Sequence, residues 1–114
     1  MMDENEFRKR SDEALTSLQR ALESASDSHD FEVDRNQGAL TIEFEDPPAK
    51  FVVSSNSPVR QIWVSARVQS FKLDWKDSAA AFVLADGRPL HRLIGDVVSD
   101  QLGEPVVLDQ NLPT

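Results

Sequence analysis

The chain has 114 residues, 39% of them hydrophobic and 28% charged, which predicts one domain over residues 1–114 with a single core. The sequence has no cysteine, which excludes disulfides, thiolate ligation of zinc or an iron–sulfur cluster by this chain, and a cysteine nucleophile. A net charge of −8 argues against nucleic acid or an anionic membrane as a partner and favours cations or basic proteins. No apolar run approaches the ~20 residues that span a bilayer and no signal-peptide pattern opens the sequence, so we expect a cytoplasmic protein.

The charge is unevenly distributed along the chain. The first 46 residues hold thirteen acidic and five basic residues, whereas residues 47–114 hold seven of each. The whole net charge therefore falls in the first two-fifths of the domain, which predicts a negative field on one surface. On charge alone, this surface is either a binding site or a device for solubility.

The first predicted element is an amphipathic helix over residues 4–25. Apolar residues recur there at steps of three and four, and Asp3 followed by Glu6 fits a variant of the capping box. Asp12 and Glu23 share the face away from the apolar stripe. They are about three turns apart, so they cannot share one ion unaided.

From Asp30 the period changes to two. Phe31 and Val33 are expected to point to the core, and Asp30, Glu32 and Asp34 to solvent. Three like charges in a row repel one another, so an external cation or a basic partner would relieve them. The turn that follows is expected at Asn36-Gln37-Gly38.

Five more strands are expected before the second helix. The next strand places Leu40, Ile42 and Phe44 in the core and ends at Asp46-Pro47-Pro48, and others are expected at about 50–54, 60–66, 68–75 and 80–84. In the strand at 60–66, Ile62 and Val64 are expected to face the core, which leaves Trp63 exposed.

A second amphipathic helix is expected to begin at Pro89 and stop at Gly103. Gly95 inside it costs about 1 kcal/mol in helix propensity. The tail is too apolar to be free in water and is expected to pack on the helices through Val106, Val107, Leu108 and Leu112.

This order of elements predicts an α+β fold. Short connections make neighbouring strands antiparallel, and two one-sided helices must cover the apolar face of the sheet. We therefore expect a two-layer sandwich, with a sheet of about six strands, the N- and C-terminal helices on one face, and Trp63 on the open face.

Four segments carry a resemblance to a known family: Glu6-Phe7, the hairpin at 38–44, the run Pro-Val-Arg-Gln-Ile-Trp-Val-Ser at 58–65, and Asp-Gly-Arg-Pro-Leu-His at 86–91. Together they resemble the frataxin family, in particular its bacterial CyaY-type members, over nearly the whole chain. The resemblance implies a protein of iron–sulfur cluster assembly without catalytic residues. Such a protein binds iron weakly and docks on the cysteine desulfurase and scaffold complex to regulate sulfur transfer.

The resemblance also implies two surfaces. The family's iron-binding acidic ridge maps onto Asp12, Glu23, Asp27, Asp30, Glu32 and Asp34. Its docking surface on the exposed sheet maps onto Asn56, Pro58, Arg60, Gln61 and Trp63. This chain departs from close relatives at Gln19 and Arg20, where they carry two glutamates, and at Ser24, which leaves a thinner ridge.

Exposed carboxylates without a preformed cage suit ferrous or ferric iron held weakly, with sensitivity to salt. His29 beside Asp30 is either a further ligand or a solvated turn histidine, and Trp63 is either a partly buried sheet residue or a contact anchor. His91 is expected to be structural or exposed. We expect a monomer, and an iron-dependent oligomer is left open. The sequence also leaves open whether the protein donates iron or regulates the desulfurase. The main alternative is a small acidic secretion chaperone or another protein-binding module. A ferroxidase is disfavoured because no closed redox-metal site can be assembled.

Overall fold

The computed structural model describes residues 2–36, 38–45 and 48–108. Within them the chain forms helix α1 (Glu4–Ser26), six strands and helix α2 (Leu90–Leu102). The strands are β1 (Glu32–Asn36), β2 (Ala39–Glu45), β3 (Pro48–Asn56), β4 (Gln61–Ala66), β5 (Gln69–Lys76) and β6 (Ala81–Val83). A 3-10 turn, Ser57–Val59, joins β3 to β4.

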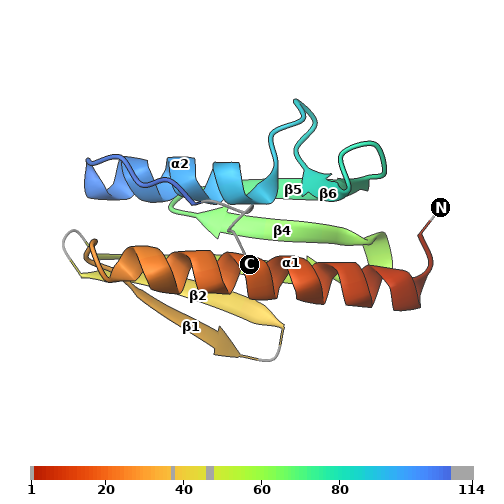
Figure 1. Cartoon of the computed structure of the whole chain (residues 1–114), viewed down its shortest axis with the longest axis horizontal. Coiled ribbons are helices and arrows are strands. Elements are labelled where there is room, and N and C mark those ends of the chain that lie inside the picture. Colours follow the sequence, from red (N-terminus) through yellow and green to blue (C-terminus); the bar gives the residue numbers. More distant parts are fainter. Residues whose placement is uncertain (1, 37, 46–47, 109–114) are drawn as a thin grey trace.

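The strands form one sheet in the order β1-β2-β3-β4-β5-β6, with every neighbouring pair antiparallel. Both helices lie over the same face of this sheet, α1 against β1 and β2 and α2 toward β6 (Figure 1). The predicted two-layer α+β sandwich with an open sheet face is confirmed.

Local signals explain the bounds of α1. Asp3 is its N-cap residue, and the Asp3 carboxylate accepts a 2.8 Å hydrogen bond from the Glu6 amide, which satisfies one of the free donors of the first turn. The apolar stripe of α1 is buried, with Phe7, Leu18 and Leu22 fully inaccessible to solvent. The helix ends at Ser26, one residue beyond the predicted end.

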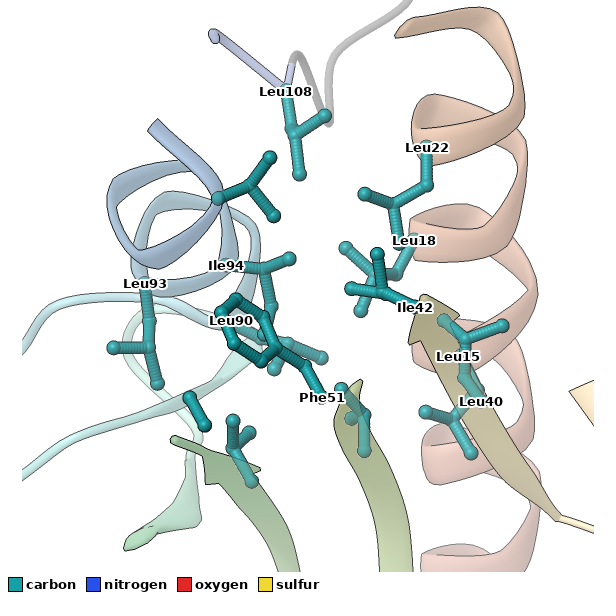
Figure 2. Packing of buried hydrophobic residues seen from close by; sticks show 14 of the residues in the cluster. Leu15, Leu18, Leu22, Leu40, Ile42, Phe51, Leu90, Leu93, Ile94 and Leu108 are labelled. Carbon is teal, nitrogen blue, oxygen red and sulfur yellow. The ribbon is translucent and has the colours of Figure 1, made fainter. Parts of the chain in front are cut away.

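The core fills the space between the two helices and the sheet (Figure 2). Leu40, Ile42 and Phe44 of β2 are buried while the residues between them are half-buried or exposed, as the two-residue period requires. The apolar faces of both helices close over this sheet face, and each buried leucine contributes about 1.5–3 kcal/mol by leaving water. This core fixes the helices, and therefore fixes which side chains remain outside.

Strands β4, β5 and β6 differ from the prediction by one residue at one or both ends, and two strands, β1 and β3, differ by more. Strand β1 begins at Glu32, because the chain turns before it, with the Phe31 amide hydrogen-bonded to the His29 carbonyl at 3.2 Å. Strand β3 is longer than 50–54 and starts at Pro48, a position where proline's missing N–H is tolerated. Gln37, Asp46 and Pro47 of the predicted turns lie outside the described residues.

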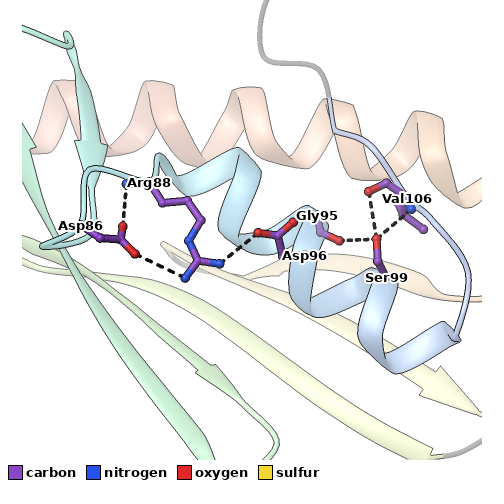
Figure 3. Close-up of polar contacts among 6 residues, drawn as sticks. All are labelled: Asp86, Arg88, Gly95, Asp96, Ser99 and Val106. Atoms are coloured by element: carbon purple, nitrogen blue, oxygen red, sulfur yellow. Dashed lines mark hydrogen bonds and ion pairs between the residues drawn. The ribbon is translucent and has the colours of Figure 1, made fainter.

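Polar contacts hold both ends of α2 (Figure 3). At its start, Pro89 is the N-cap residue and not the first helical one, and Arg88 lies 3.0 Å from the Asp96 carboxylate and 3.8 Å from that of Asp86. At its end, Gly103 takes the left-handed conformation, with φ of 69°, as predicted for a helix stop.

The tail packs on α2 at Gly95 and Ser99. A side chain at Gly95 would bring its Cβ within 3.3 Å of the Val106 carbonyl oxygen, so the glycine in mid-helix permits this close approach. Val106 is buried, as is Leu108, which lies between the helices (Figure 2).

The prediction for Val107 is wrong, because this side chain is 86% exposed. The tail passes the helices as an extended segment, and in such a segment alternate side chains point in opposite directions. Leu112 lies outside the described residues.

Candidate functional site

The helix part of the predicted acidic ridge lies on the solvent face of α1. Asp12, Glu23 and Asp27 are all exposed, and Asp27 is the C-cap residue of α1. The last turn of α1 contains no basic residue, so Glu23 and Asp27 add their charge to the negative end of the helix dipole. This end of α1 therefore favours a cation.

The strand part of the ridge lies on and before β1. Glu32 and Asp34 are exposed while Val33 and Arg35 between and after them are half-buried, so the predicted alternation is correct for these two carboxylates. Asp30 is exposed but precedes β1 and is not part of the strand.

Glu43 adds a carboxylate that the ridge prediction omitted. It lies directly opposite Glu32 in the β1–β2 ladder and is exposed. Like charges in directly opposed positions destabilise a sheet, and exposed Lys50, opposite Glu43 on β3, supplies one positive charge on the other side. Glu43 could be identified only from the register of β1 and β2. A shift of one residue in this register would place a different residue opposite Glu32.

Arg35 is the second residue that the prediction missed, and it changes the ridge. Its guanidinium donates a 2.7 Å hydrogen bond from Nη2 to the Asp12 carboxylate and another of 2.7 Å from Nη1 to the Thr16 hydroxyl. The side chain of Arg35 is 20% exposed. A signal was present in the sequence: position 35 has the same parity as the inward-facing Val33, so an arginine there must reach a partner on α1.

The ridge carboxylates do not converge. Across the part of the chain that the structure describes, no three Asp, Glu or His side chains form a group that would hold a metal ion. His29, considered as a further ligand, contacts the Glu104 carboxylate at the start of the tail. His91 is buried, and its Nε2 lies 3.2 Å from the Ser17 hydroxyl, which fits the structural role.

Trp63 lies on the open face of the sheet, with 38% of its surface exposed. Its indole Nε1 donates a 2.9 Å hydrogen bond to the Gln61 side chain, and Gln61 in turn donates to Asp74 across the β4–β5 pair at 3.1 Å. The Lys72 ammonium lies 5.0 Å from the centre of the indole ring, within the range of a cation–π contact. The Trp63 side chain is thus held in one orientation.

The other predicted docking residues surround the connection from β3 to β4. Asn56 ends β3 and pairs with Gln61, while Pro58 is exposed in the 3-10 turn. Arg60 takes a left-handed backbone conformation, with φ of 53°, and its amide closes the turn onto the Ser57 carbonyl at 3.1 Å. These residues therefore lie at one corner of the sheet, where β3 connects to β4, the strand that carries Trp63.

Comparison with known proteins agrees with this architecture. A model of the frataxin-like domain matches residues 1–104, so the chain belongs to the frataxin-like family, which is non-enzymatic. Within it, the chain is similar to bacterial proteins named iron-sulfur cluster assembly protein CyaY. That of Janthinobacterium sp. (strain Marseille) is 34% identical over 110 residues, covering 94% of this chain and 96% of the relative. That of Dechloromonas aromatica (strain RCB) is 36% identical over 107 residues, covering 94% and 99%.

A solved structure shares the fold. Frataxin from Psychromonas ingrahamii matches with a TM-score of 0.82 and 20% sequence identity, covering 95% of this chain and 99% of that one. In the described residues, no helix is both long and apolar enough to cross a membrane.

Proposed function

We propose that this protein is an iron-binding regulator and adaptor of iron–sulfur cluster assembly. It binds ferrous or ferric iron weakly through the acidic ridge and docks, as a cytoplasmic monomer, on the cysteine desulfurase and its scaffold protein. Family membership supports the assembly role, since the relatives are named for it. Because the chain has no cysteine, its contribution comes from carboxylates and contacts, and the partners supply the sulfur.

The observation that carries the iron-binding proposal is the exposed negative surface where α1 ends and β1 begins. Glu23, Asp27, Asp30, Glu32 and Asp34 are exposed there, beside the negative end of the α1 dipole. Carboxylate oxygens suit hard cations. Because they form no closed cage, water completes the coordination of a bound ion, and the binding is weak and reversible.

The docking proposal depends on Trp63. A tryptophan that is held in one orientation loses little entropy on contact, and tryptophan is enriched at binding hot spots. A secretion chaperone would instead need a continuous apolar surface. In the described residues, the large exposed hydrophobic side chains lie on four different elements: Val59, Trp63, Val68 and Val107.

Iron binding is tested by titrating the protein with Fe²⁺ under anaerobic conditions and with Fe³⁺, followed by NMR, and then adding the cysteine desulfurase. We expect the amide signals of residues 23–34 to change in both steps, with iron affinity that falls as salt rises. Unchanged signals from these residues in both steps would reject the proposed function.

The docking surface is tested separately with Trp63→Ala. We expect the affinity for the desulfurase to fall by about tenfold or more, the scale of a hot-spot residue. Val68→Ala is the matched control, because it removes an exposed apolar side chain at the tip of the β4–β5 hairpin. Equal affinity of wild type and Trp63→Ala for the desulfurase would contradict the anchor role of Trp63. The iron-binding proposal would still stand.

A further inference from the structure

The Arg35 side chain reaches from β1 to α1 and contacts the part of the ridge around Asp12. Its guanidinium contacts the Asp12 carboxylate and the Thr16 hydroxyl, each at 2.7 Å, and the Gln19 side-chain oxygen at 3.5 Å. Gln19 then donates from Nε2 to the Glu23 carboxylate at 3.2 Å. One strand arginine thus contacts one ridge carboxylate directly and reaches a second through a glutamine.

The surroundings of Asp12 are cationic, although the chain as a whole is acidic. Asp12 lines a surface hollow of about 440 Å³ together with Arg35, Arg8 and Lys9. Arg8 is itself paired with Glu4 at 3.0 Å, so Arg35 and Lys9 are the two positive charges around this carboxylate that Glu4 does not offset. A metal ion approaching Asp12 is repelled by both. At Asp27, Asp30, Glu32 and Asp34, in contrast, the structure shows no ion pair with a basic side chain among the described residues.

The contact of Arg35 with Asp12 opposes the binding of a metal by Asp12. The hydrogen bond uses Asp12 Oδ1, and a cation held by this carboxylate would lie beside a fixed positive charge in partly screened surroundings. The guanidinium is also pre-organised, because β1 and Thr16 hold it where it is. A metal ion that takes both Asp12 oxygens must displace Arg35, and one that takes Oδ2 alone is repelled by the guanidinium beside it.

We infer that Arg35 is a built-in counter-ion that withholds Asp12 from metal and confines metal binding to the end of the ridge formed by Asp27, Asp30, Glu32 and Asp34. The inference rests on the proposed iron-binding function and concerns which part of the ridge performs it. We expect Asp12 to bind metal strongly only when Arg35 is absent or displaced.

A purely structural role for Arg35 makes a different prediction. An inward-pointing charge on an edge strand such as β1 also protects the sheet from pairing with other chains. Loss of that role alone would promote self-association without creating a metal site at Asp12. The two roles are therefore separated by the place where metal binds.

The test is a double-mutant cycle of Arg35→Gln and Asp12→Asn. Anaerobic Fe²⁺ titration calorimetry gives the affinity, and diamagnetic La³⁺ followed by NMR gives the location. We expect Arg35→Gln to strengthen metal binding by about fivefold or more, with new changes at the amides of Asp12 and Thr16. Asp12→Asn alone should change the affinity by less than about twofold, and added to Arg35→Gln it should abolish the gain.

Arg92→Gln is the matched control. It removes one positive charge from an exposed side chain of the other helix, α2, and Arg92 does not line the hollow around Asp12. An exposed charge away from both Asp12 and the ridge is largely screened at physiological salt, so we expect less than about a twofold gain and no change at Asp12. Thermal unfolding without metal checks that each variant is folded.

The outcomes separate the inference from the proposed function. If wild type binds metal at residues 27–34 and Arg35→Gln gains no more than Arg92→Gln, the inference is overturned and the function stands. A wild type that already responds at Asp12 also overturns the inference alone. If neither wild type nor Arg35→Gln binds metal, both are overturned, and a gain that Asp12→Asn removes supports the inference.

Discussion

Gln61 fixes the orientation of Trp63 on the open sheet face. Its side chain accepts the indole hydrogen bond of Trp63 and donates to Asp74, so one residue links the exposed ring to the next strand. Hydrogen bonds of this kind at an exposed site contribute about 0.5–1.5 kcal/mol. We expect their main effect to be on the position of the ring, because the core beneath does not depend on them.

Gln61→Leu tests this role. The Trp63 indole N–H loses its acceptor, so its hydrogen exchange measured by NMR should become faster, while the free energy of unfolding should change by less than about 1.5 kcal/mol. Trp75 on β5 is the internal control. Its indole donates a 2.7 Å hydrogen bond to Asp77, so its hydrogen exchange should not change. Unchanged exchange at Trp63 would mean that the ring is held by its packing and by Lys72 alone.

At single residues, the sequence predicted faces but not partners. Alternation along β4 was sufficient to place Trp63 outside, and the structure agrees. The bond from Gln61 to Trp63 and the bond from Arg35 to Asp12 depend on side-chain rotamers and on the distance between α1 and β1, which no local pattern contains. For the same reason the six ridge carboxylates could be named from the resemblance, while the ion pair of Asp12 with Arg35 could not.

Among the elements, the docking of the tail on α2 depends on Ser99. Its hydroxyl accepts a 2.8 Å hydrogen bond from the Val106 amide and lies 2.7 Å from the Gly95 carbonyl, to which it donates (Figure 3). This single side chain therefore satisfies a backbone donor in the half-buried contact. Without it the Val106 amide loses a partner close to the core.

We expect Ser99→Ala to lower the free energy of unfolding by about 1–2 kcal/mol, the cost of leaving such a donor unsatisfied. Amide exchange at Val106 and Leu108 should accelerate, measured beside urea unfolding. Ser24→Ala is the control, because Ser24 is an exposed serine of α1, where alanine is the better helix former. Equal stability of the two variants would show that the tail does not depend on this bond.

The helices were easier to predict than the strands. Asp3 at the start of α1 and Gly103 at the end of α2 are signals within the helices themselves, so the predicted bounds fall within one residue. The extent of β3 is set by its neighbours, since Pro48 pairs with Glu45 and Asn56 with Gln61. Strand ends of this kind depend on register, which is a property of the whole sheet.

Across the whole molecule, the fold separates the charge into two regions. The acidic first part of the chain forms α1, the edge strand β1 and its neighbour β2, while exposed Lys50 and Lys72 lie on β3 and β5 farther into the sheet. Under the proposed function, we expect a basic partner to be attracted toward the ridge and then to contact Trp63, a division between electrostatic steering and an apolar anchor. Such steering weakens as salt rises.

The most direct test of the account is the affinity of the purified cysteine desulfurase for a variant in which Asp27, Asp30, Glu32 and Asp34 are replaced by their amides. It should be measured by titration calorimetry at about 50 and 300 mM salt. A charge-matched control replaces four carboxylates outside the ridge: Glu4, Glu6, Glu13 and Asp100. We predict that wild type and control bind alike and lose about tenfold or more in affinity at the higher salt, and that the ridge variant binds weakly at both. Equal losses in the ridge variant and the control, or wild-type affinity that ignores salt, would contradict the account.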